Sequence, residues 1–227
     1  MKEKYPKSVL VIAPHPDDES LGCGGTLLRH KCDGDEIHWL IITGMSSAQG
    51  FSSEKISVRE AEIAEVGKLY GFKSTFELGL APAQLDILPM GEVISAISKV
   101  VSEVRPDTVY TVYRNDAHTD HQVVFDAVMA ATKSFRYPFV KEVLAYETIS
   151  ETDFGYKPED GGFKPNAFVD IADYLTKKLE ILDVFESEMG EFPFPRSREA
   201  VAALAKVRGV QCGALAAEAF MLIKGIR

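Results

Sequence analysis

Short apolar runs alternate with helical patterns along the chain. Three clear runs are SVLVIA at residues 8–13, IHWLIIT at 37–43 and TVYTVY at 108–113. Each is followed by a segment in which apolar residues recur at the spacing of a helix. This alternation is typical of a parallel sheet whose strands are connected by helices. We therefore predict an α/β fold, specifically a Rossmann-like three-layer αβα domain with a mostly parallel sheet.

The same patterns predict the remaining elements. Further strands are expected at residues 74–78, 142–148, 168–171 and 218–226. Helices are expected at residues 21–32, 54–70, 90–103, 120–133, 173–188 and 197–209. For the helix at 54–70, Ser52 or Ser53 is the expected N-cap and Gly71 the expected C-cap. Residues 152–165 and 190–197 are expected loops. No linker divides the chain, so we predict that residues 1–227 form a single domain.

The composition narrows the class of protein. The chain of 227 residues has a formal net charge of −9, which argues against a general attraction to nucleic acid or anionic membranes. No apolar stretch approaches the ~20 residues of a membrane-spanning helix. Cys23, Cys32 and Cys212 show no CxxC spacing, which argues against a disulfide framework and suits a reducing compartment. We therefore expect a cytoplasmic protein that neither binds nucleic acid nor inserts into a membrane.

Charged residues crowd the end of the first predicted strand. SVLVIA runs into Pro14 and then directly into His15, Pro16, Asp17, Asp18 and Glu19. Neighbouring carboxylates repel one another unless a positive charge lies among them. In open α/β sheets, ligands bind outside the carboxyl ends of the strands, which is where this cluster is expected to lie.

A second polar cluster follows the predicted strand at 108–113. The sequence RNDAHTDHQ contains Asp116, His118, Asp120 and His121. Two clusters at one edge of a sheet can meet in space, and their imidazoles and carboxylates suit Zn²⁺. A catalytic zinc site typically has three protein ligands and a position for water, and an acid outside the ligand set can act as general base towards that water. A bound metal would also neutralise the crowded acids.

Two simpler interpretations account for less of the pattern. Gly22, Gly24 and Gly25 are similar to part of a dinucleotide-binding turn, but the turn itself is PHPDDE, whose carboxylates would meet the nucleotide phosphates. The acids could instead cap the helix that is expected to begin at residue 21, but one Asp is enough for a cap. HTDH alone would indicate a solvated helix start. Its position after a second strand favours the joint site.

These motifs resemble those of the LmbE/PIG-L family of metal-dependent N-deacetylases. HPDDE at 15–19, GCGGTL at 22–27 and HTDH at 118–121 carry the resemblance. It extends to PNAFVDIADYLTKKLEIL at 165–182 and RGVQCGALAAEAF at 208–220, and so covers nearly the whole chain. The resemblance implies hydrolysis of the acetamide of an N-acetylated amino sugar or sugar conjugate of the N-acetylglucosaminyl type, with release of acetate and a free amine.

The resemblance also implies a metal site and its base. His15, Asp18 and His121 would be the ligands of Zn²⁺, and such a set of two histidines and one aspartate also accepts Fe²⁺. Asp17 would be the general base. Glu19 would support the metal-binding loop from outside the ligand set.

Four further residues receive roles from the resemblance. His118 would stabilise the oxyanion or protonate the leaving amine, with Asp120 setting the orientation and charge of its ring. Arg59 and Asp86 would contact the substrate.

Other functions remain open at this point. His and Asp clusters also build two-metal phosphoesterase sites, although the present set is short of ligands for two metals. A non-catalytic, metal-stabilised carbohydrate-binding protein would need neither Asp17 nor His118. The expected partner is a small N-acetyl sugar conjugate, whose aglycone the loops at 45–53 and 152–165 do not reveal. We also expect a homo-oligomer.

Overall fold

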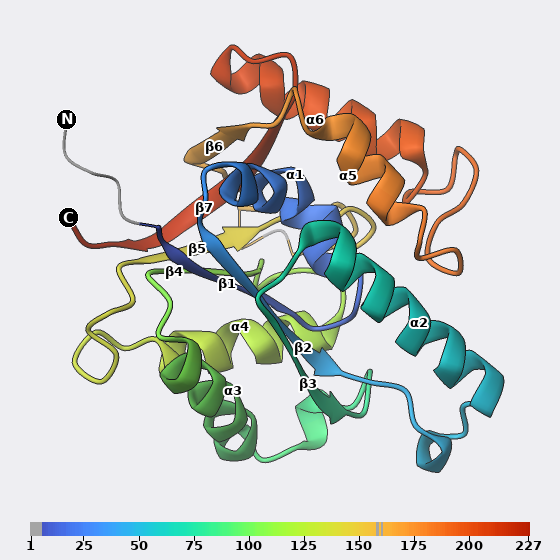
Figure 1. The fold of residues 1–227 in the computed structure, drawn as a ribbon, viewed down its shortest axis with the longest axis vertical. Coiled ribbons are helices and arrows are strands. Elements are labelled where there is room, and N and C mark those ends of the chain that lie inside the picture. Colours follow the sequence, from blue (N-terminus) through green and yellow to red (C-terminus); the bar gives the residue numbers. More distant parts are fainter. Residues whose placement is uncertain (1–5, 158, 160) are drawn as a thin grey trace.

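A seven-stranded sheet forms the centre of the part of the chain that the computed structural model describes, residues 6–157, 159 and 161–227 (Figure 1). Its strands are β1 (Ser8–Ala13), β2 (Glu36–Thr43), β3 (Ser74–Leu80), β4 (Thr108–Val112), β5 (Glu142–Tyr146), β6 (Ala167–Asp170) and β7 (Ala217–Gly225). They lie in the order β3-β2-β1-β4-β5-β7-β6. Strands β1 to β5 pair in parallel, whereas β7 is antiparallel to both of its neighbours.

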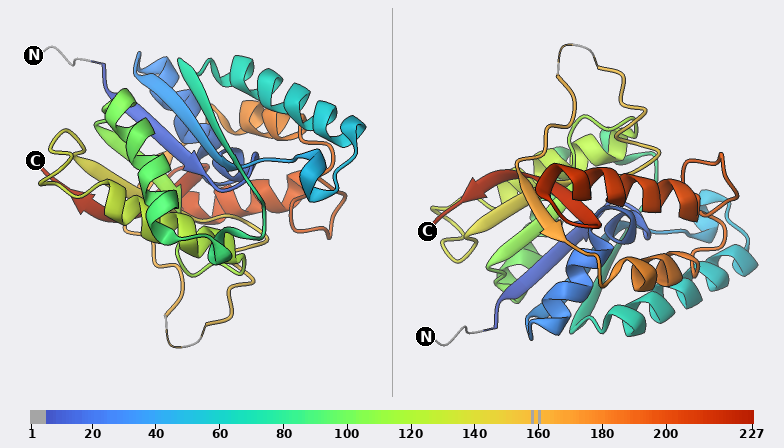
Figure 2. Two further views of the ribbon diagram at one scale, coloured as in Figure 1. Left: turned by 90° about the horizontal axis from the view of Figure 1, so that it is seen from below. Right: turned by 90° about the horizontal axis from the view of Figure 1, so that it is seen from above.

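Helices cover both faces of this sheet. They are α1 (Asp18–Cys32), α2 (Ser53–Tyr70), α3 (Met90–Val104), α4 (Thr119–Ala131), α5 (Leu175–Leu182) and α6 (Arg198–Cys212), with short 3₁₀ helices η1 (Ser47–Gln49) and η2 (Leu85–Ile87). Helices α1, α2, α5 and α6 lie on one face, and α3 and α4 lie on the other (Figures 1 and 2). The predicted three-layer αβα fold with a mostly parallel sheet is therefore confirmed.

Local sequence signals define the ends of α2 and α3. The Ser52 hydroxyl accepts the Lys55 N–H at 3.3 Å, and Gly71 ends α2 in the left-handed region with φ 69°. Ser52 is thus the N-cap and Gly71 the C-cap, in agreement with the prediction. Helix α3 ends at Val104, and its C-cap Arg105 stands directly before Pro106, whose ring disfavours a helical conformation in the preceding residue. The buried face of α3 has the spacing expected of an amphipathic helix: Val93, Ile97, Val100 and Val101.

The helix predicted at residues 173–188 is shorter in the structure. Helix α5 ends at Leu182, and the next turn is tighter because the N–H groups of Val184 and Phe185 bond carbonyls three residues back, at 3.1 and 3.0 Å. This turn buries the Phe185 ring completely and leads to Glu188, which lines the cavity described below. A tertiary contact, rather than the local periodicity, therefore ends the helix.

Helix α1 is kinked by buried charges from distant elements. The backbone of Cys23 leaves the helical region, with φ −141°. The Glu218 carboxylate of β7 accepts two backbone N–H groups from the second half of α1, at 2.8 and 2.7 Å. Lys178 of α5 donates to the Leu21 carbonyl at 2.8 Å and to Glu218 at 2.7 Å. The kink therefore leaves these buried backbone groups paired.

The GCGG sequence lets α1 pack closely against its neighbours. A Cβ added at Gly22 would lie 2.1 Å from the Tyr146 ring, and one at Gly25 would lie 2.8 Å from Ile171. These glycines serve close packing of α1 against the sheet and against the residue that follows β6. They therefore have a structural function, in a position that superficially resembles a phosphate-binding turn.

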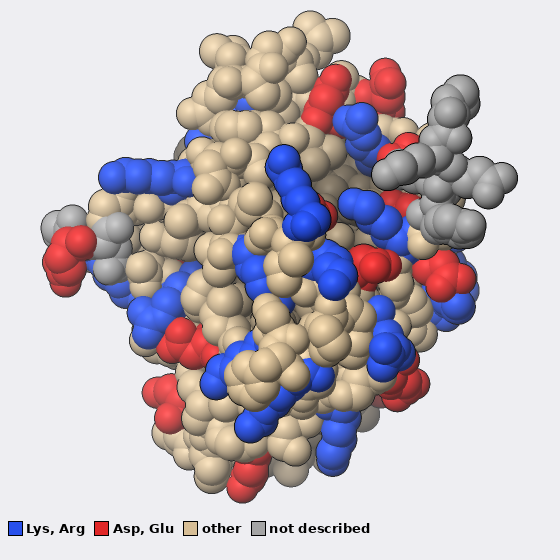
Figure 3. All heavy atoms as spheres, turned by 90° about the vertical axis from the view of Figure 1, so that its left-hand side faces the viewer, with Lys and Arg blue, Asp and Glu red and all other residues tan. Residues whose placement is uncertain are grey.

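The surface charge is unevenly distributed. On the face seen in Figure 3, which is the left-hand side of Figure 1, Lys and Arg side chains gather near the centre among uncharged residues. The acidic excess of the chain therefore does not cover this face uniformly. Among the described residues, no helix has the length and apolar character needed to cross a membrane.

We predict that Gly22→Ala destabilises the fold by about 1–3 kcal/mol, the usual cost of overpacking a core. The Tyr146 ring cannot easily move away, because it is fully buried and its hydroxyl donates to the Ile12 carbonyl at 2.9 Å. Urea unfolding followed by circular dichroism measures the effect. Gly91→Ala is the matched control, since nothing lies within 4 Å of its added Cβ in α3, and its stability should be equal or higher. Equal stabilities for the two variants would contradict the close contact.

Candidate active site

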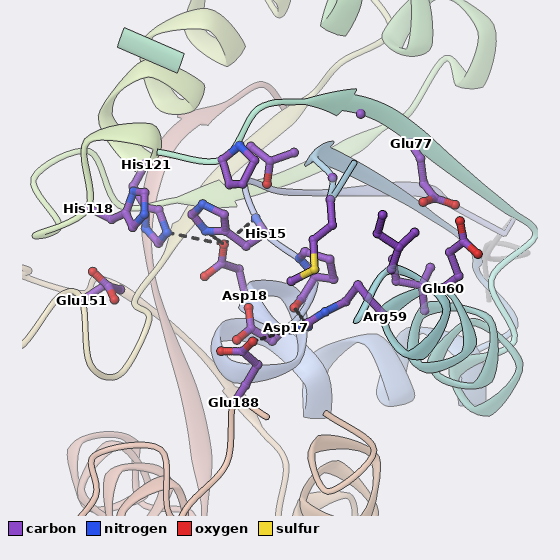
Figure 4. A pocket seen from close by; sticks show the side chains of 18 of the residues that line it. His15, Asp17, Asp18, Arg59, Glu60, Glu77, His118, His121, Glu151 and Glu188 are labelled. Atoms are coloured by element: carbon purple, nitrogen blue, oxygen red, sulfur yellow. Dashed lines mark hydrogen bonds and ion pairs between the residues drawn. The ribbon is translucent and has the colours of Figure 1, made fainter. Parts of the chain in front are cut away.

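The loops that follow β1 and β4 meet at the carboxyl edge of the sheet. The strand order reverses between these two strands, which is where open α/β sheets commonly bind ligands. A cavity of about 400 Å³ opens there. Figure 4 shows that His15 and Asp18, from the loop after β1 and the first turn of α1, lie beside His118 and His121, from the loop after β4 and the first turn of α4, and that Asp17 lies near Glu188. The two polar clusters of the sequence therefore line one cavity.

Three side chains bring possible metal ligands together. The Asp18 Oδ2 atom lies 3.3 Å from His15 Nδ1 and 3.4 Å from His121 Nε2. One ligand atom from each of the three residues lies within 4.8 Å of the others. His118 and Asp120 form a second such group with His15. The Asp120 carboxylate is already bonded, however, to the His15 ring and to two backbone N–H groups. The first group is therefore the better candidate.

In the first group, each histidine has a carboxylate partner at the ring nitrogen that points away from Asp18. His121 Nδ1 lies 2.7 Å from Asp116 Oδ2, and His15 Nε2 lies 3.1 Å from Asp120 Oδ2. Asp116 is itself held by the Thr152 hydroxyl, which donates at 2.6 Å. Such contacts orient the imidazoles and leave the opposite ring nitrogen of each free to bind a metal.

The buried polar atoms of the site fit a cation. His121 Nε2 is buried and has no hydrogen-bond partner among the described residues, although it faces Asp18. Burial alone would lower the pKa of His121, but Asp18 and Asp116 raise it to about 10. The pKa of His15 is likewise raised to about 9, chiefly by Asp120 and Asp18 against the effect of burial. The carboxylates thus demand positive charge at the point that the three donors share, and a divalent metal would satisfy it.

Asp17 is buried beside this group but does not belong to it. Its backbone has φ 135°, an unusual conformation for a residue other than glycine, and strain of this kind costs about 1–3 kcal/mol and clusters at functional sites. The Arg196 Nη1 atom lies 3.5 Å from the Asp17 carboxylate. Burial and the Asp18 charge raise the pKa of Asp17 well above its usual range, while Arg196 opposes them. A shifted pKa of this kind, in a cavity and beside a specific charge partner, makes Asp17 a candidate for proton transfer.

Glu19 holds the loop from inside the fold. Its carboxylate accepts the Asp17 N–H at 3.1 Å and the Ser20 hydroxyl at 2.6 Å. Tyr70 of α2 in turn donates to the Ser20 hydroxyl at 3.1 Å. Glu19 is fully buried, and burial raises its pKa to about 7. These contacts link the strained backbone at Asp17 to α2.

His118 lies at the N-cap of α4 with a defined tautomer. Its Nδ1 atom accepts the Asp120 N–H at 3.1 Å, so that the ring proton of the neutral form lies on Nε2. Burial, followed by the charge of His15, lowers the pKa of His118 and favours this neutral form. The Asp120 carboxylate is 3.9 Å from His118 and bonds His15 instead. The backbone of Asp120, rather than its carboxylate, thus orients the His118 ring.

The chain matches the PIG-L family, described as GlcNAc-PI de-N-acetylase, over residues 10–132. It belongs to this family. The match contains both loops of the cavity and every residue of the candidate metal site. The resemblance seen in the sequence motifs is therefore confirmed.

Similar proteins extend the likeness over most of the chain. The uncharacterized deacetylase YaiS of Escherichia coli is 31% identical over 80% of this chain and 91% of its own length. The diacetylchitobiose deacetylase of Thermococcus kodakarensis is 27% identical over 97% of this chain and 84% of its own. The crystal structure of the conserved protein TT1542 from Thermus thermophilus has a TM-score of 0.77 and 26% identity, and it covers 97% of this chain and 96% of that one.

The two substrate residues suggested by the PIG-L resemblance have different positions. Arg59 lines the cavity, but its guanidinium is paired with Glu62 at 3.3 Å and with Glu188, and it donates to the Pro16 carbonyl at 3.2 Å. It therefore fastens the loop that follows β1 to α2. Asp86 is exposed in η2 and is not among the residues that line the cavity.

Some residues of the site received no role from the sequence: Asp116, Glu151, Glu188 and Arg196. Asp116 stands within RNDAHTDHQ, so its position two residues before His118 was a usable signal for a supporting carboxylate. Arg196 follows the FPFP sequence, where nothing in the local pattern indicates a contact with Asp17. Such a contact joins residues far apart in the chain and depends on the tertiary fold.

We predict that Asp116→Asn lowers the affinity for Zn²⁺ by about 10- to 100-fold, because the amide cannot supply the negative charge behind His121. Competition with a chromogenic chelator measures the affinity, and circular dichroism checks the fold. The control is Asp126→Asn, which removes a half-exposed partner of Arg114 on α4 and should leave the affinity within about twofold. A folded Asp116→Asn variant with unchanged affinity would remove Asp116 from the site.

Proposed function

We propose that the protein is a metal-dependent N-deacetylase that hydrolyses the acetamide of an N-acetylated amino sugar or sugar conjugate. The observation that carries the proposal is one cavity lined by a three-residue metal site, a buried acid outside that site and a histidine with a proton on Nε2. The deacetylase names of the two protein relatives described above support the same reaction class.

In this proposal His15, Asp18 and His121 hold a divalent metal, with Zn²⁺ as the first candidate and Fe²⁺ as the second. Bound there, the ion would polarise the acetamide carbonyl and lower the pKa of a water molecule. Asp116 and Asp120 keep the two imidazoles in place, and Glu19 keeps the loop in place.

The residues beside the metal site supply the proton transfers. Asp17 accepts a proton from water as the water oxygen attacks the carbonyl carbon. His118 donates a hydrogen bond from Nε2 to the oxygen on which negative charge develops. The C–N bond then breaks, the leaving nitrogen receives the proton, and acetate and a free amine are released. Arg196 keeps a positive charge beside Asp17 while the acid gains and loses its proton.

The alternatives have less support. A two-metal phosphoesterase needs a second ligand set, but the second donor group shares His15 with the first, and its Asp120 is already bonded. A non-catalytic binding protein gives no reason for the strained backbone at Asp17. We also propose a cytoplasmic location, since all three cysteines are free thiols. The homo-oligomer stays a prediction.

The first experiment measures acetate release from N-acetylglucosamine, diacetylchitobiose and N-acetylglucosaminyl conjugates. We expect activity that disappears after chelation and returns with Zn²⁺ or Fe²⁺. Asp17→Asn should retain the metal but lose about 10²- to 10⁴-fold in kcat, because the amide cannot accept a proton from water. Near-normal activity of this variant, with metal bound, would exclude Asp17 as the base. Activity that survives full removal of the metal would contradict the metal-dependent reaction.

A second prediction concerns Arg196. Arg196→Met should lower kcat by about tenfold, equivalent to ~1.4 kcal/mol, because the Asp17 carboxylate loses its arginine ion-pair partner. Arg196→Lys should restore part of this loss, and Zn²⁺ affinity should stay unchanged, since no candidate metal ligand contacts Arg196. An equal loss of kcat in the Arg196→Met and Arg196→Lys variants would show that the shape of the Arg196 side chain matters, rather than its charge.

A further inference from the structure

A second hollow adjoins the active-site cavity. It has a volume of about 390 Å³, lies between α2 and β3, and shares Glu60, Ile63 and Glu77 with the 400 Å³ cavity. Beyond these shared residues it extends to Phe72 and Thr75. The two hollows therefore adjoin each other at these three residues, and the outer one lies between α2 and the edge strand of the sheet. Each part alone has a volume typical of small-ligand pockets.

Two acidic side chains flank the passage between the two hollows. Glu60 comes from α2 and Glu77 from β3, and Figure 4 shows them facing each other at the end of the cavity away from His118 and His121. Both are exposed. No hydrogen bond or ion pair joins the side-chain carboxylate of either residue to another described residue. Their carboxylates are therefore free to contact whatever passes between the two hollows.

The cations near this passage are engaged elsewhere. Arg59 pairs with Glu62 and Glu188. Arg196 lies between Asp17 and Glu188. Lys68, which lines the outer hollow, pairs with Glu65 at 3.3 Å, and Lys31 donates to the carbonyl of Gly71, another lining residue, at 3.0 Å. Among the described residues, the negative charge of the passage is thus left without a paired cation.

We propose that the outer hollow is a second sugar-binding subsite, and that the substrate is a chain of at least two sugar units. This inference rests on the proposed deacetylase function. The unit with the acetamide occupies the inner cavity. The next unit passes between Glu60 and Glu77 and is neutral or carries a free amino group. Carboxylate oxygens accept strong hydrogen bonds from hydroxyl and ammonium groups, whereas an acidic aglycone is repelled.

The test compares three substrates by their kcat/KM for acetate release. They are N-acetylglucosamine, a disaccharide of N-acetylglucosamine linked to glucosamine with a free amine, and N-acetylglucosamine linked to a carboxylate-bearing aglycone. The wild-type protein should prefer the disaccharide over the other two. In the double variant Glu60→Gln with Glu77→Gln, kcat/KM should fall about three- to tenfold for the disaccharide, mainly through KM, and rise for the carboxylate substrate. Glu103→Gln, an exposed acid on α3 away from both hollows, is the control.

In the double variant, the expected changes in kcat/KM have opposite signs for the disaccharide and for the carboxylate substrate. This difference separates selection by charge from damage to the fold. A loss of the same size on all three substrates would overturn the subsite proposal, because a structural defect does not distinguish charge. So would a wild-type protein that hydrolyses the monosaccharide as well as the disaccharide. Absence of acetate from every substrate, with metal bound and the fold intact, would instead overturn the proposed deacetylase function.

Discussion

The site depends on an excess of negative charge where β1 and β4 end. Asp18, Asp116 and Asp120 surround two imidazoles within hydrogen-bonding or ion-pair distance, and these carboxylates raise the pKa values of His15 and His121 against the effect of burial. Such crowding is unstable without a cation. The buried Glu218–Lys178 pair that supports the kink of α1, and the glycines that let this helix lie close, hold the acidic loop in place.

Hydrogen bonds assign different tasks to chemically similar acids. Asp116 bonds Nδ1 of His121, and Asp120 bonds Nε2 of His15. Asp18 is therefore the acid that faces the other ring nitrogen of each histidine. Asp17 stands apart because its left-handed backbone turns its carboxylate towards Arg196. In the proposed mechanism, a single turn of chain thus supplies a metal ligand and a separate proton acceptor in adjacent positions. The strain at Asp17 is a cost of this arrangement.

Much of the fold could be predicted from the sequence, because strand runs, caps and the alternation of elements are local signals. The meeting of the two polar clusters could also be predicted, since parallel strands end at the same edge of the sheet, whereas the choice of His15, Asp18 and His121 as ligands followed from the family resemblance. The contacts that refine the site were not predictable in this way. Arg196 reaches Asp17 from a loop without a periodic pattern, Asp120 bonds a histidine 105 positions earlier in the chain, and Asp86 lies outside the cavity. These facts depend on how separate elements pack.

The placement of cations links metal binding to substrate choice. Arg59 and Arg196 lie near the inner end of the cavity, and both are paired there with acids. Neither is paired with the outer carboxylates of Glu60 and Glu77. Negative charge at the inner end is therefore suited to a divalent ion, while negative charge at the outer end is left for the substrate. On the two proposals above, negative charge serves both purposes: hydrogen-bonded carboxylates would bind the ion, and solvent-facing carboxylates would select the sugar that follows.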